Sequence, residues 1–274
     1  MDIYARVKAF YDNYTGEKQI IGKSRLGRNI YALKIGNGSP VGLAQYALHG
    51  REWITAKLAL WHITIGITTG SFWTIPLSNP DGALLSEIGL PSVTSPRLRR
   101  RLIAYNCGEN FSLWKANAVG VDLNVNFDAR WGTGAKNTRV AGSENYVGPR
   151  PFSEPESRAL AQFTLQVRPQ FTVSYHTKGE EIYWYFHQSL RTCSVDKRLA
   201  MALSRSTGYP LRHAKNSVGG YKDWCIQRCK IPSFTIEAGA DTFTHPIGEE
   251  GFENIRVKNE RALNDLIKEY SFGI

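Results

Sequence analysis

The sequence predicts an α/β fold in which one twisted sheet, of mixed parallel and antiparallel strands, is covered by helices on both faces. Two observations lead to this prediction. Short apolar runs typical of buried strands alternate along the chain with longer segments whose apolar residues recur at helical spacing. The 274 residues, 42% of them hydrophobic, are enough to bury a large core and contain no repeat, linker or low-complexity segment. We therefore expect a single domain, residues 1–274.

The N-terminal third alternates helix and strand patterns. Residues 1–14 are amphipathic at helical spacing, and residues 27–36 alternate apolar and polar side chains as a half-buried strand does. Residues 42–50 form a second strand pattern, which leads directly into residues 51–67, a segment with the length and composition of a covered helix. Residues 71–83 indicate a strand broken by a turn at NPDG, because proline sets φ and glycine permits a left-handed conformation.

The remaining chain begins with a loop-like stretch at residues 86–110. Residues 151–167 then predict a helix that starts with a capping box between Ser153 and Glu156. Three further elements complete the pattern: strands at residues 170–176 and 231–239, and an amphipathic helix at residues 249–270.

The net charge of +10 alone does not identify a partner. The basic residues are dispersed apart from RLRRR at 97–101, which we expect to be a solvated loop, and no nucleic-acid motif accompanies them, so nucleic acid is not an expected partner. The longest apolar stretch, residues 54–69, is interrupted by Lys57 and His62 and is too short to span a bilayer, so membrane insertion is not expected. His62 itself is expected to be a satisfied structural histidine. The first residues lack the pattern of a signal peptide, which predicts a cytoplasmic protein unless a leader has been removed.

Polar side chains stand where three predicted strands end. His49 and Glu52 follow the strand at 42–50, and as an i, i+3 pair they share one face of a turn. That pair alone indicates either a metal site or one polar pair at the start of a hydrophobic helix. His176 and Glu237 end two further apolar strands. Because two histidines and a carboxylate with a fourth position open for water form a known catalytic zinc set, the three strand ends predict a zinc site.

Six stretches carry a family resemblance: HGREWIT, NPDG, GVDLNVNF, GPRPFSEPESRAL, SYH and SFTIE, in that order. With them the chain resembles the zinc peptidases of the carboxypeptidase A superfamily over roughly residues 20–245. The resemblance implies that His49, Glu52 and His176 bind one zinc ion per chain. It also implies that Glu237 is the general base and acid.

The resemblance implies further roles and shows one departure. An arginine after a tryptophan stabilises the oxyanion in the family, and Lys115 stands there in this chain, unless it is a solvated surface lysine. The family's Asn-Arg pair, which holds a terminal carboxylate, is Asn124-Val125 here, so the bidentate clamp is missing. Arg130 or Arg150, from a neighbouring loop, is a candidate to replace it.

Other substrate contacts depend on position relative to Glu237. Counting back without gaps places Lys215 at the family's mobile catalytic tyrosine and Lys222 at the base of its specificity pocket. A lysine at the pocket base favours an acidic group, because a buried ammonium needs a counter-charge. The adjacent Tyr221 and, inside HGREWIT, Arg51 are also expected to contact substrate.

These departures, with SLWKAN, VDLNVNFDARWG, ENYVGPRPFSEPE, SYHTKGEEIYW and GGYKDW, make the chain most similar to bacterial γ-D-glutamyl-meso-diaminopimelate peptidases. The similarity implies hydrolysis of the γ-D-glutamyl to meso-diaminopimelate bond in peptidoglycan stem peptides. Glu180 or Glu181 is a candidate partner for the diaminopimelate amine, although both are equally well explained as solvated loop acids. Two other hypotheses remain. A metallocarboxypeptidase that releases acidic C-terminal residues is supported by Lys222 but opposed by Val125, and a binding protein without catalysis is opposed by the intact zinc set.

Overall fold

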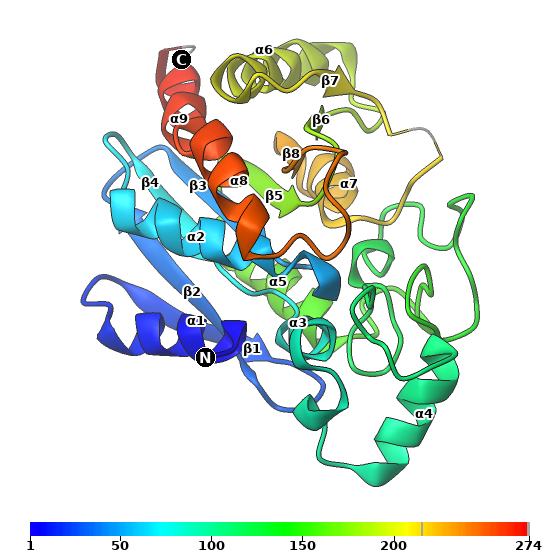
Figure 1. The fold of residues 1–274 in the computed structure, drawn as a ribbon. Coiled ribbons are helices and arrows are strands. Elements are labelled where there is room, and N and C mark those ends of the chain that lie inside the picture. Colours follow the sequence, from blue (N-terminus) through cyan, green and yellow to red (C-terminus); the bar gives the residue numbers. More distant parts are fainter. Residues whose placement is uncertain (215, 273–274) are drawn as a thin grey trace.

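The computed structural model describes residues 1–214 and 216–272, except for the side chains of residues 190 and 191. In this part of the chain the strands form one eight-stranded sheet in the order β1-β2-β4-β3-β5-β8-β6-β7 (Figure 1). The strands are β1 (Lys18–Lys23), β2 (Asn29–Gly36), β3 (Val41–Tyr46), β4 (Ser71–Ile75), β5 (Phe171–His176), β6 (Glu181–Tyr183), β7 (Leu211–Arg212) and β8 (Ser233–Glu237).

The sheet is mixed. Strand β3 pairs in parallel with β4 and β5, and β5 pairs in parallel with β8. Antiparallel pairs flank this centre, since β2 pairs with β1 and β4 on one side and β6 pairs with β8 on the other. The predicted α/β class is therefore confirmed, whereas the assignment of residues 1–274 to one domain stays a prediction.

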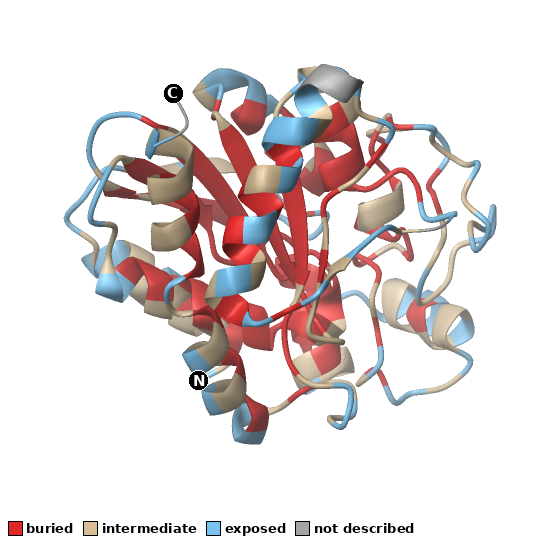
Figure 2. Cartoon of the chain, turned by 90° about the horizontal axis from the view of Figure 1, so that it is seen from above, coloured by how far each residue is buried: buried red, intermediate tan, exposed pale blue. Residues whose placement is uncertain are grey.

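Helices cover both faces of the sheet, so that the strands lie buried between them (Figure 2). On one face α1 contacts β2, α2 contacts β3 and β4, and α8 and α9 pack with α2 and α6. On the other face α5 contacts β1, and α7 contacts β5 and β8. The helices are α1 (Ile3–Asn13), α2 (Ile54–Ile65), α3 (Pro80–Ile88), α4 (Pro96–Asn106), α5 (Pro155–Val167), α6 (Leu190–Thr207), α7 (Tyr221–Trp224), α8 (Phe252–Asn259) and α9 (Ala262–Phe272).

Side chains on the central strands alternate between two hydrophobic cores. On β2, Tyr31, Leu33 and Ile35 belong to the core under α1 and α2, while Ile30 and Ala32 belong to the core under α5. This alternation follows from the two-residue period of a strand. Because both faces are covered, both sets are apolar, as expected for a sheet with parallel strands at its centre.

The parallel register places three strand ends at one edge of the sheet. Tyr46 at the end of β3 pairs with Tyr175 of β5, and His176 pairs with Glu237 at the end of β8. Side chains at or just beyond these ends therefore lie close together. The long loops between α4 and α5, drawn in green in Figure 1, lie on the same side of the molecule as α4.

The predicted turn at NPDG is wrong. Asn79 caps helix α3 by accepting a hydrogen bond from the backbone N–H of Gly82 at 2.9 Å, and Pro80 is the first residue of the helix. Asparagine and proline favour the start of a helix as well as a turn, so the residue types alone do not distinguish the two.

The predicted loop at 86–110 is also wrong, because it contains helix α4. Ser95 caps this helix through its side chain, and RLRRR lies on the helix rather than in a loop. Leu98 and Leu102, four residues apart, pack in a small core with Trp114. The helix therefore buries a narrow apolar stripe, while its arginines dominate the sequence pattern.

The predicted capping box at Ser153 is not formed. Helix α5 begins at Pro155, and the Ser153 hydroxyl donates to Glu154 and accepts from the Asn126 side chain. Helix α6 and the two edge strands, β1 and β7, have no counterpart among the predicted elements. Among the described residues, no helix combines the length and the apolar composition that crossing a membrane requires.

Candidate active site

The first ligand turn joins β3 to α2. After the strand ends, residues Gly50–Glu52 form a 3₁₀ turn, and α2 begins at Ile54. The Thr55 hydroxyl donates to the backbone oxygen of Glu52 and accepts from the N–H of Ala47, both at 2.9 Å, so it fixes both ends of the turn. A side chain at Gly50 would begin 2.4 Å from a backbone oxygen of α3, which explains the glycine in this tightly packed turn.

His49, Glu52 and His176 form a buried group with the geometry of a metal site. Their ligand atoms all lie within 4.8 Å of one another. Each histidine presents Nδ1 at 2.9 Å from a different carboxylate oxygen of Glu52, and the two Nδ1 atoms are 3.1 Å apart. Ligands about 2.0–2.1 Å from a tetrahedral zinc ion are roughly 3.3 Å apart, so the group fits such an ion. The Nε2 atom of His176 is buried and has no hydrogen-bond partner among the described residues.

Asp122, which the sequence did not single out, supports this group from behind. Its Oδ1 lies 3.3 Å from Nε2 of His49, so its negative charge stands beside this nitrogen while Nδ1 faces Glu52 in the ligand group. Its Oδ2 lies 3.4 Å from Nζ of Lys115 and accepts from the backbone of Asn145. Although burial alone raises the pKa of Asp122, Lys115 and His49 hold it well below its usual range. The acid stands inside the quoted GVDLNVNF motif, which was the available signal.

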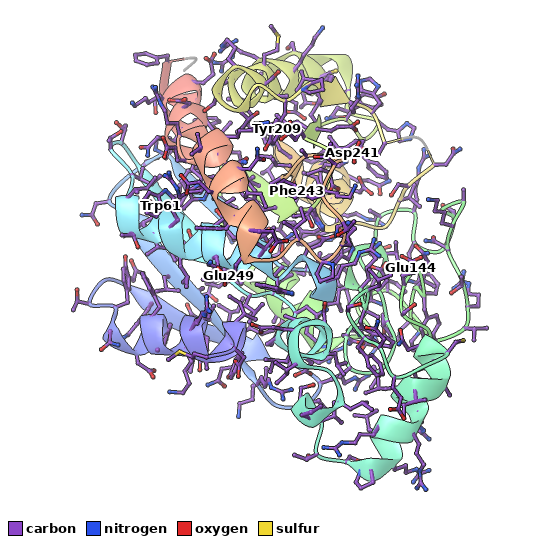
Figure 3. All side chains as sticks on the ribbon, in the orientation of Figure 1. Trp61, Glu144, Tyr209, Asp241, Phe243 and Glu249 are labelled. Atoms are coloured by element: carbon purple, nitrogen blue, oxygen red, sulfur yellow. The ribbon has the colours of Figure 1, made fainter. Side chains whose placement is uncertain are left out.

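Lys115 lies beside the ligand group, next to Asp122, and is not a solvated surface lysine. Its side chain is only 16% exposed. Burial lowers the pKa of Lys115, but the charges of Asp122 and Glu52 outweigh it and raise the pKa above its usual value. Glu144, labelled in Figure 3, lies on the long loop, 4.0 Å from Lys115 and 3.9 Å from Arg51. The structure therefore brings Lys115 and Arg51 together beside the ligand turn.

Glu237 ends the strand next to His176, in register with it. Burial, joined by the charges of Glu52 and Glu181, raises the pKa of Glu237 to about 7, against the opposing charges of His176 and Lys115. This carboxylate also lines a pocket of about 270 Å³. The other lining residues are Asn124, Tyr183, His213, Ala214, Ser217, Gly220, Lys222, Asp223 and Thr235. Glu237 thus connects the ligand group to the pocket.

A larger cavity, of about 540 Å³, lies elsewhere, between the start of α6, the π-helical turn Cys225–Cys229 and α9. None of the site residues predicted from the sequence lines it. We therefore place the candidate substrate site in the smaller pocket, which shares Glu237 with the ligand group.

Asn124 faces the pocket with its amide orientation fixed. Its Oδ1 accepts a hydrogen bond from the backbone N–H of Tyr221 at 3.2 Å, which leaves its NH₂ group as a donor. Two glycines allow this contact. A side chain at Gly219, where φ is +87°, would begin 3.1 Å from the backbone oxygen of Val125, and one at Gly220 would begin 3.0 Å from Oδ1 of Asn124.

The structure does not bring the side chain of Tyr221 to the pocket. Its side chain is fully buried in the core, its hydroxyl lies 2.7 Å from the Thr164 hydroxyl, and it does not line the pocket. The structure does not bring Arg130 or Arg150 to the pocket either, since both are exposed and neither lines it. Lys215, the position of the family's mobile tyrosine, lies outside the described residues.

Lys222 lines the pocket as predicted by position, but its charge is already paired. Its Nζ lies 2.6 Å from Oδ1 of Asp223 and donates to the backbone oxygen of Tyr185 at 3.2 Å. Glu180 and Glu181 do not line the pocket; Glu180 pairs with a lysine of α8, and Glu181 accepts from Tyr183. Two acidic side chains line the pocket, Glu237 and Asp223, and Asp223 is the one paired with Lys222.

His62 on α2 is a structural histidine, as predicted. Its Nδ1 lies 2.7 Å from the Tyr46 hydroxyl and its Nε2 lies 3.0 Å from the backbone oxygen of Asn259. A neutral ring satisfies both contacts when Nε2 donates and Nδ1 accepts. Burial lowers the pKa of His62 to about 4, which keeps the ring neutral at pH 7.

A mixed α/β sheet that carries two histidines and a carboxylate at one edge, with a second carboxylate beside them, is typical of metal-dependent hydrolases. Comparison with protein families is consistent with this class: residues 5–254 match the zinc carboxypeptidase family, Peptidase_M14. The chain belongs to this family, and the relation predicted from the motifs is confirmed.

Two curated relatives show how far the similarity extends. The gamma-D-glutamyl-L-diamino acid endopeptidase 1 of Lysinibacillus sphaericus is 36% identical over 249 residues, which cover 84% of this chain and 62% of that protein. Carboxypeptidase B of Bos taurus is 31% identical over 252 residues, which cover 80% of this chain and 57% of that protein. The chain therefore spans less than two thirds of the length of either relative.

Solved structures share the fold. Bovine thrombin-activatable fibrinolysis inhibitor, in complex with tick carboxypeptidase inhibitor, matches with a TM-score of 0.78 at 19% identity and covers 100% of this chain and 98% of its own. The murein-tripeptide amidase MpaA from Escherichia coli O157 matches with a TM-score of 0.59 at 22% identity and covers 95% of each chain. At these identities the likeness concerns the fold alone.

Proposed function

We propose that this chain is a zinc-dependent peptidase that hydrolyses the γ-D-glutamyl to meso-diaminopimelate bond of peptidoglycan stem peptides. The observation that carries the chemical part of the proposal is the buried group of His49, Glu52 and His176 with Glu237 at the adjacent strand end. The substrate part is supported by the 36% identical relative named as a gamma-D-glutamyl-L-diamino acid endopeptidase.

Each residue of the site has a separate role in the proposed reaction. A zinc ion held by His49, Glu52 and His176 would supply a water of lowered pKa and polarise the scissile carbonyl. Glu237 accepts a proton from the attacking water on a carboxylate oxygen and then delivers it to the leaving amine, whose C–N bond breaks. Lys115 places its ammonium charge near the developing oxyanion, as a point donor rather than a fork.

We propose two residues as substrate contacts, Asn124 in the pocket and Arg51 next to the ligand turn. Asn124 offers its NH₂ group to a substrate oxygen in the pocket. Arg51, whose buried Nε has no hydrogen-bond partner among the described residues, is proposed to bind the substrate next to the ligand turn. Without the family's arginine at Val125, a lone C-terminal carboxylate has no bidentate partner at that position.

The test uses the zinc-loaded protein and two peptides. One is L-Ala-γ-D-Glu-meso-diaminopimelate, and the other is an ordinary α-linked peptide that ends in glutamate. We expect cleavage of the first at the γ-D-glutamyl bond, observed by mass spectrometry of the products. Cleavage of only the second would overturn the proposal in favour of a carboxypeptidase for acidic residues, a reading that the Lys222–Asp223 pair opposes by neutralising the lysine.

A further inference from the structure

We propose that Lys222 and Asp223 together form a subsite that selects a side chain ending in both an ammonium and a carboxylate. The distal end of meso-diaminopimelate has this chemistry. The inference rests on the proposed function for the bond that is cleaved, and it adds which groups of the substrate are read and by which residues.

The pair lies at the wall of the 270 Å³ pocket that Glu237 also lines. The side chains of Lys222 and Asp223 are only 7% and 6% exposed, and their charged atoms are 2.6 Å apart. Both residues belong to the short helix α7, which packs against β5 and β8, the strands that carry His176 and Glu237. The pair is therefore held at a fixed place relative to the reacting groups.

The hydrogen bonds formed with other described residues do not use the full capacity of either charged group. The Lys222 ammonium has three donors, of which one bonds Asp223 and one bonds the backbone oxygen of Tyr185. Asp223 accepts from Lys222 on Oδ1 and from the backbone N–H of Gly220 on Oδ2, at 3.2 Å. Each carboxylate oxygen can accept a second bond, so the contacts among the described residues leave one donor and two acceptor positions for a ligand.

Charge balance decides which ligand suits this wall. A side chain with only a carboxylate gains Lys222 but meets the carboxylate of Asp223, and one with only an ammonium gains Asp223 but meets Lys222. In a buried site such like-charge contacts are costly. A side chain with both groups places its carboxylate at the free donor of Lys222 and its ammonium at the free acceptors of Asp223. Every charge then has an opposite partner.

The volume and the other lining residues of the pocket also suit a single side chain with a polar end. The volume of about 270 Å³ is below the usual range for drug-sized ligands and suits one amino-acid side chain. Tyr183 and His213 line it as aromatic walls, and Asn124 adds an amide donor. The acids expected from the sequence, Glu180 and Glu181, do not line the pocket; Glu180 pairs with Lys258, and Glu181 accepts from the Tyr183 hydroxyl.

The experiment compares four peptides, L-Ala-γ-D-Glu-X, that differ only at the end of the third side chain. X is meso-diaminopimelate, L-lysine, L-2-aminopimelate or L-2-aminoheptanoate, which carry both groups, the ammonium alone, the carboxylate alone and neither group. Cleavage is measured with the zinc-loaded protein, and binding is measured by calorimetry with Glu237→Gln. We expect meso-diaminopimelate to exceed each single-charge peptide by roughly 10- to 100-fold in both measurements, the effect of one charge-assisted hydrogen bond.

Two variants separate the contributions. Lys222→Met should reduce the preference for meso-diaminopimelate over lysine to within a few-fold, because the carboxylate loses its partner. Asp223→Asn, which keeps an oxygen for the Gly220 N–H, should instead reduce the preference over aminopimelate. Arg228→Met is the matched control, since it removes an exposed ion pair with Asp128 from the next turn and should leave all ratios unchanged. Thermal unfolding verifies that each variant folds.

The outcomes distinguish the subsite from the proposed function. Equal binding of all four peptides by Glu237→Gln, or an equal loss for all four in both variants, would overturn the subsite. Expected binding ratios without hydrolysis of any γ-D-glutamyl peptide by the zinc-loaded protein would leave the subsite standing and overturn the proposed bond. Hydrolysis of all four peptides at one rate would support the proposed bond and overturn the subsite.

Discussion

The two ends of the cleft are built differently. At the metal end, His49, Glu52, His176 and Glu237 stand at or directly after the ends of central strands, and α2 fixes the ligand turn. At the recognition end, defined here as Asn124 and residues 219–223, the side chains come from a 3₁₀ turn, a glycine pair and one helical turn. The difference indicates that the chemical groups are fixed by the sheet, while the groups that select substrate are fixed by turns that can vary between relatives.

The largest effect is expected at the metal end. Glu237→Gln removes the proton acceptor but keeps the size of the side chain, so kcat/KM for L-Ala-γ-D-Glu-meso-diaminopimelate should fall by about 10²–10⁴-fold. Zinc content measured by elemental analysis should stay the same, because His49, Glu52 and His176 are intact. Unchanged turnover would contradict the role of Glu237.

A second prediction concerns the support beneath the metal end. The bond between His62 and Tyr46 joins α2 to β3, the two elements that flank the ligand turn. The pKa of His62 is about 4 when folded and near 6.5 when unfolded, so the unfolded chain binds more protons between these values. The contribution to stability is therefore present above pH 6.5 and is lost as the pH falls toward 4. The loss is about 3 kcal/mol.

This prediction is checked by urea unfolding of wild type and His62→Gln across pH 4–7. Glutamine does not titrate and offers a donor toward Asn259. We expect the wild type to lose about 3 kcal/mol more than the variant over this range. Parallel stability curves for the two proteins would show that His62 does not titrate with the predicted pKa.

A third prediction tests whether the carboxylate behind His49 matters for the metal. Asp122→Asn removes the negative charge shared by His49 and Lys115. The affinity for zinc, measured by competition with a chelator, should fall by about 10- to 100-fold. Asp128→Asn, at an exposed acid on the same loop, is the control and should leave the affinity unchanged.

The smallest effect is expected at the recognition end. Asn124→Asp keeps an oxygen for the Tyr221 N–H but replaces the amide donor by a second acceptor. KM for the stem tripeptide should rise by roughly tenfold with little change in kcat, because a binding contact is lost rather than a proton transfer. A fall in kcat at constant KM would place Asn124 in the chemical step instead.

The same difference explains what the sequence predicts well. The metal end was predictable because an apolar run marks each strand, and the polar residue that ends it must lie at the edge of the sheet. Errors arose where one local pattern serves two structures. Asn79 and Pro80 suit a turn or a helix start, and the arginines of 97–101 hid the apolar stripe of α4.

The recognition end was predictable only in part, because counting along the chain does not give the direction of a side chain. Lys222 lines the pocket, but its neighbour Tyr221 points into the core toward Thr164. Asp223 was missed because only the three-dimensional structure shows that it pairs with Lys222. The spacing of residues along the sequence does not indicate whether two adjacent charged side chains pair with each other.

The glycine pair at 219–220 also has a consequence for protein engineering. A library that aims to alter substrate choice would randomise Asn124, Lys222 and Asp223 and keep both glycines fixed. Any larger residue at 219 or 220 meets the 124–125 backbone or the Asn124 amide and displaces the whole recognition end. Such clones would lose activity for reasons unrelated to specificity, and a screen would score them wrongly as poor binders.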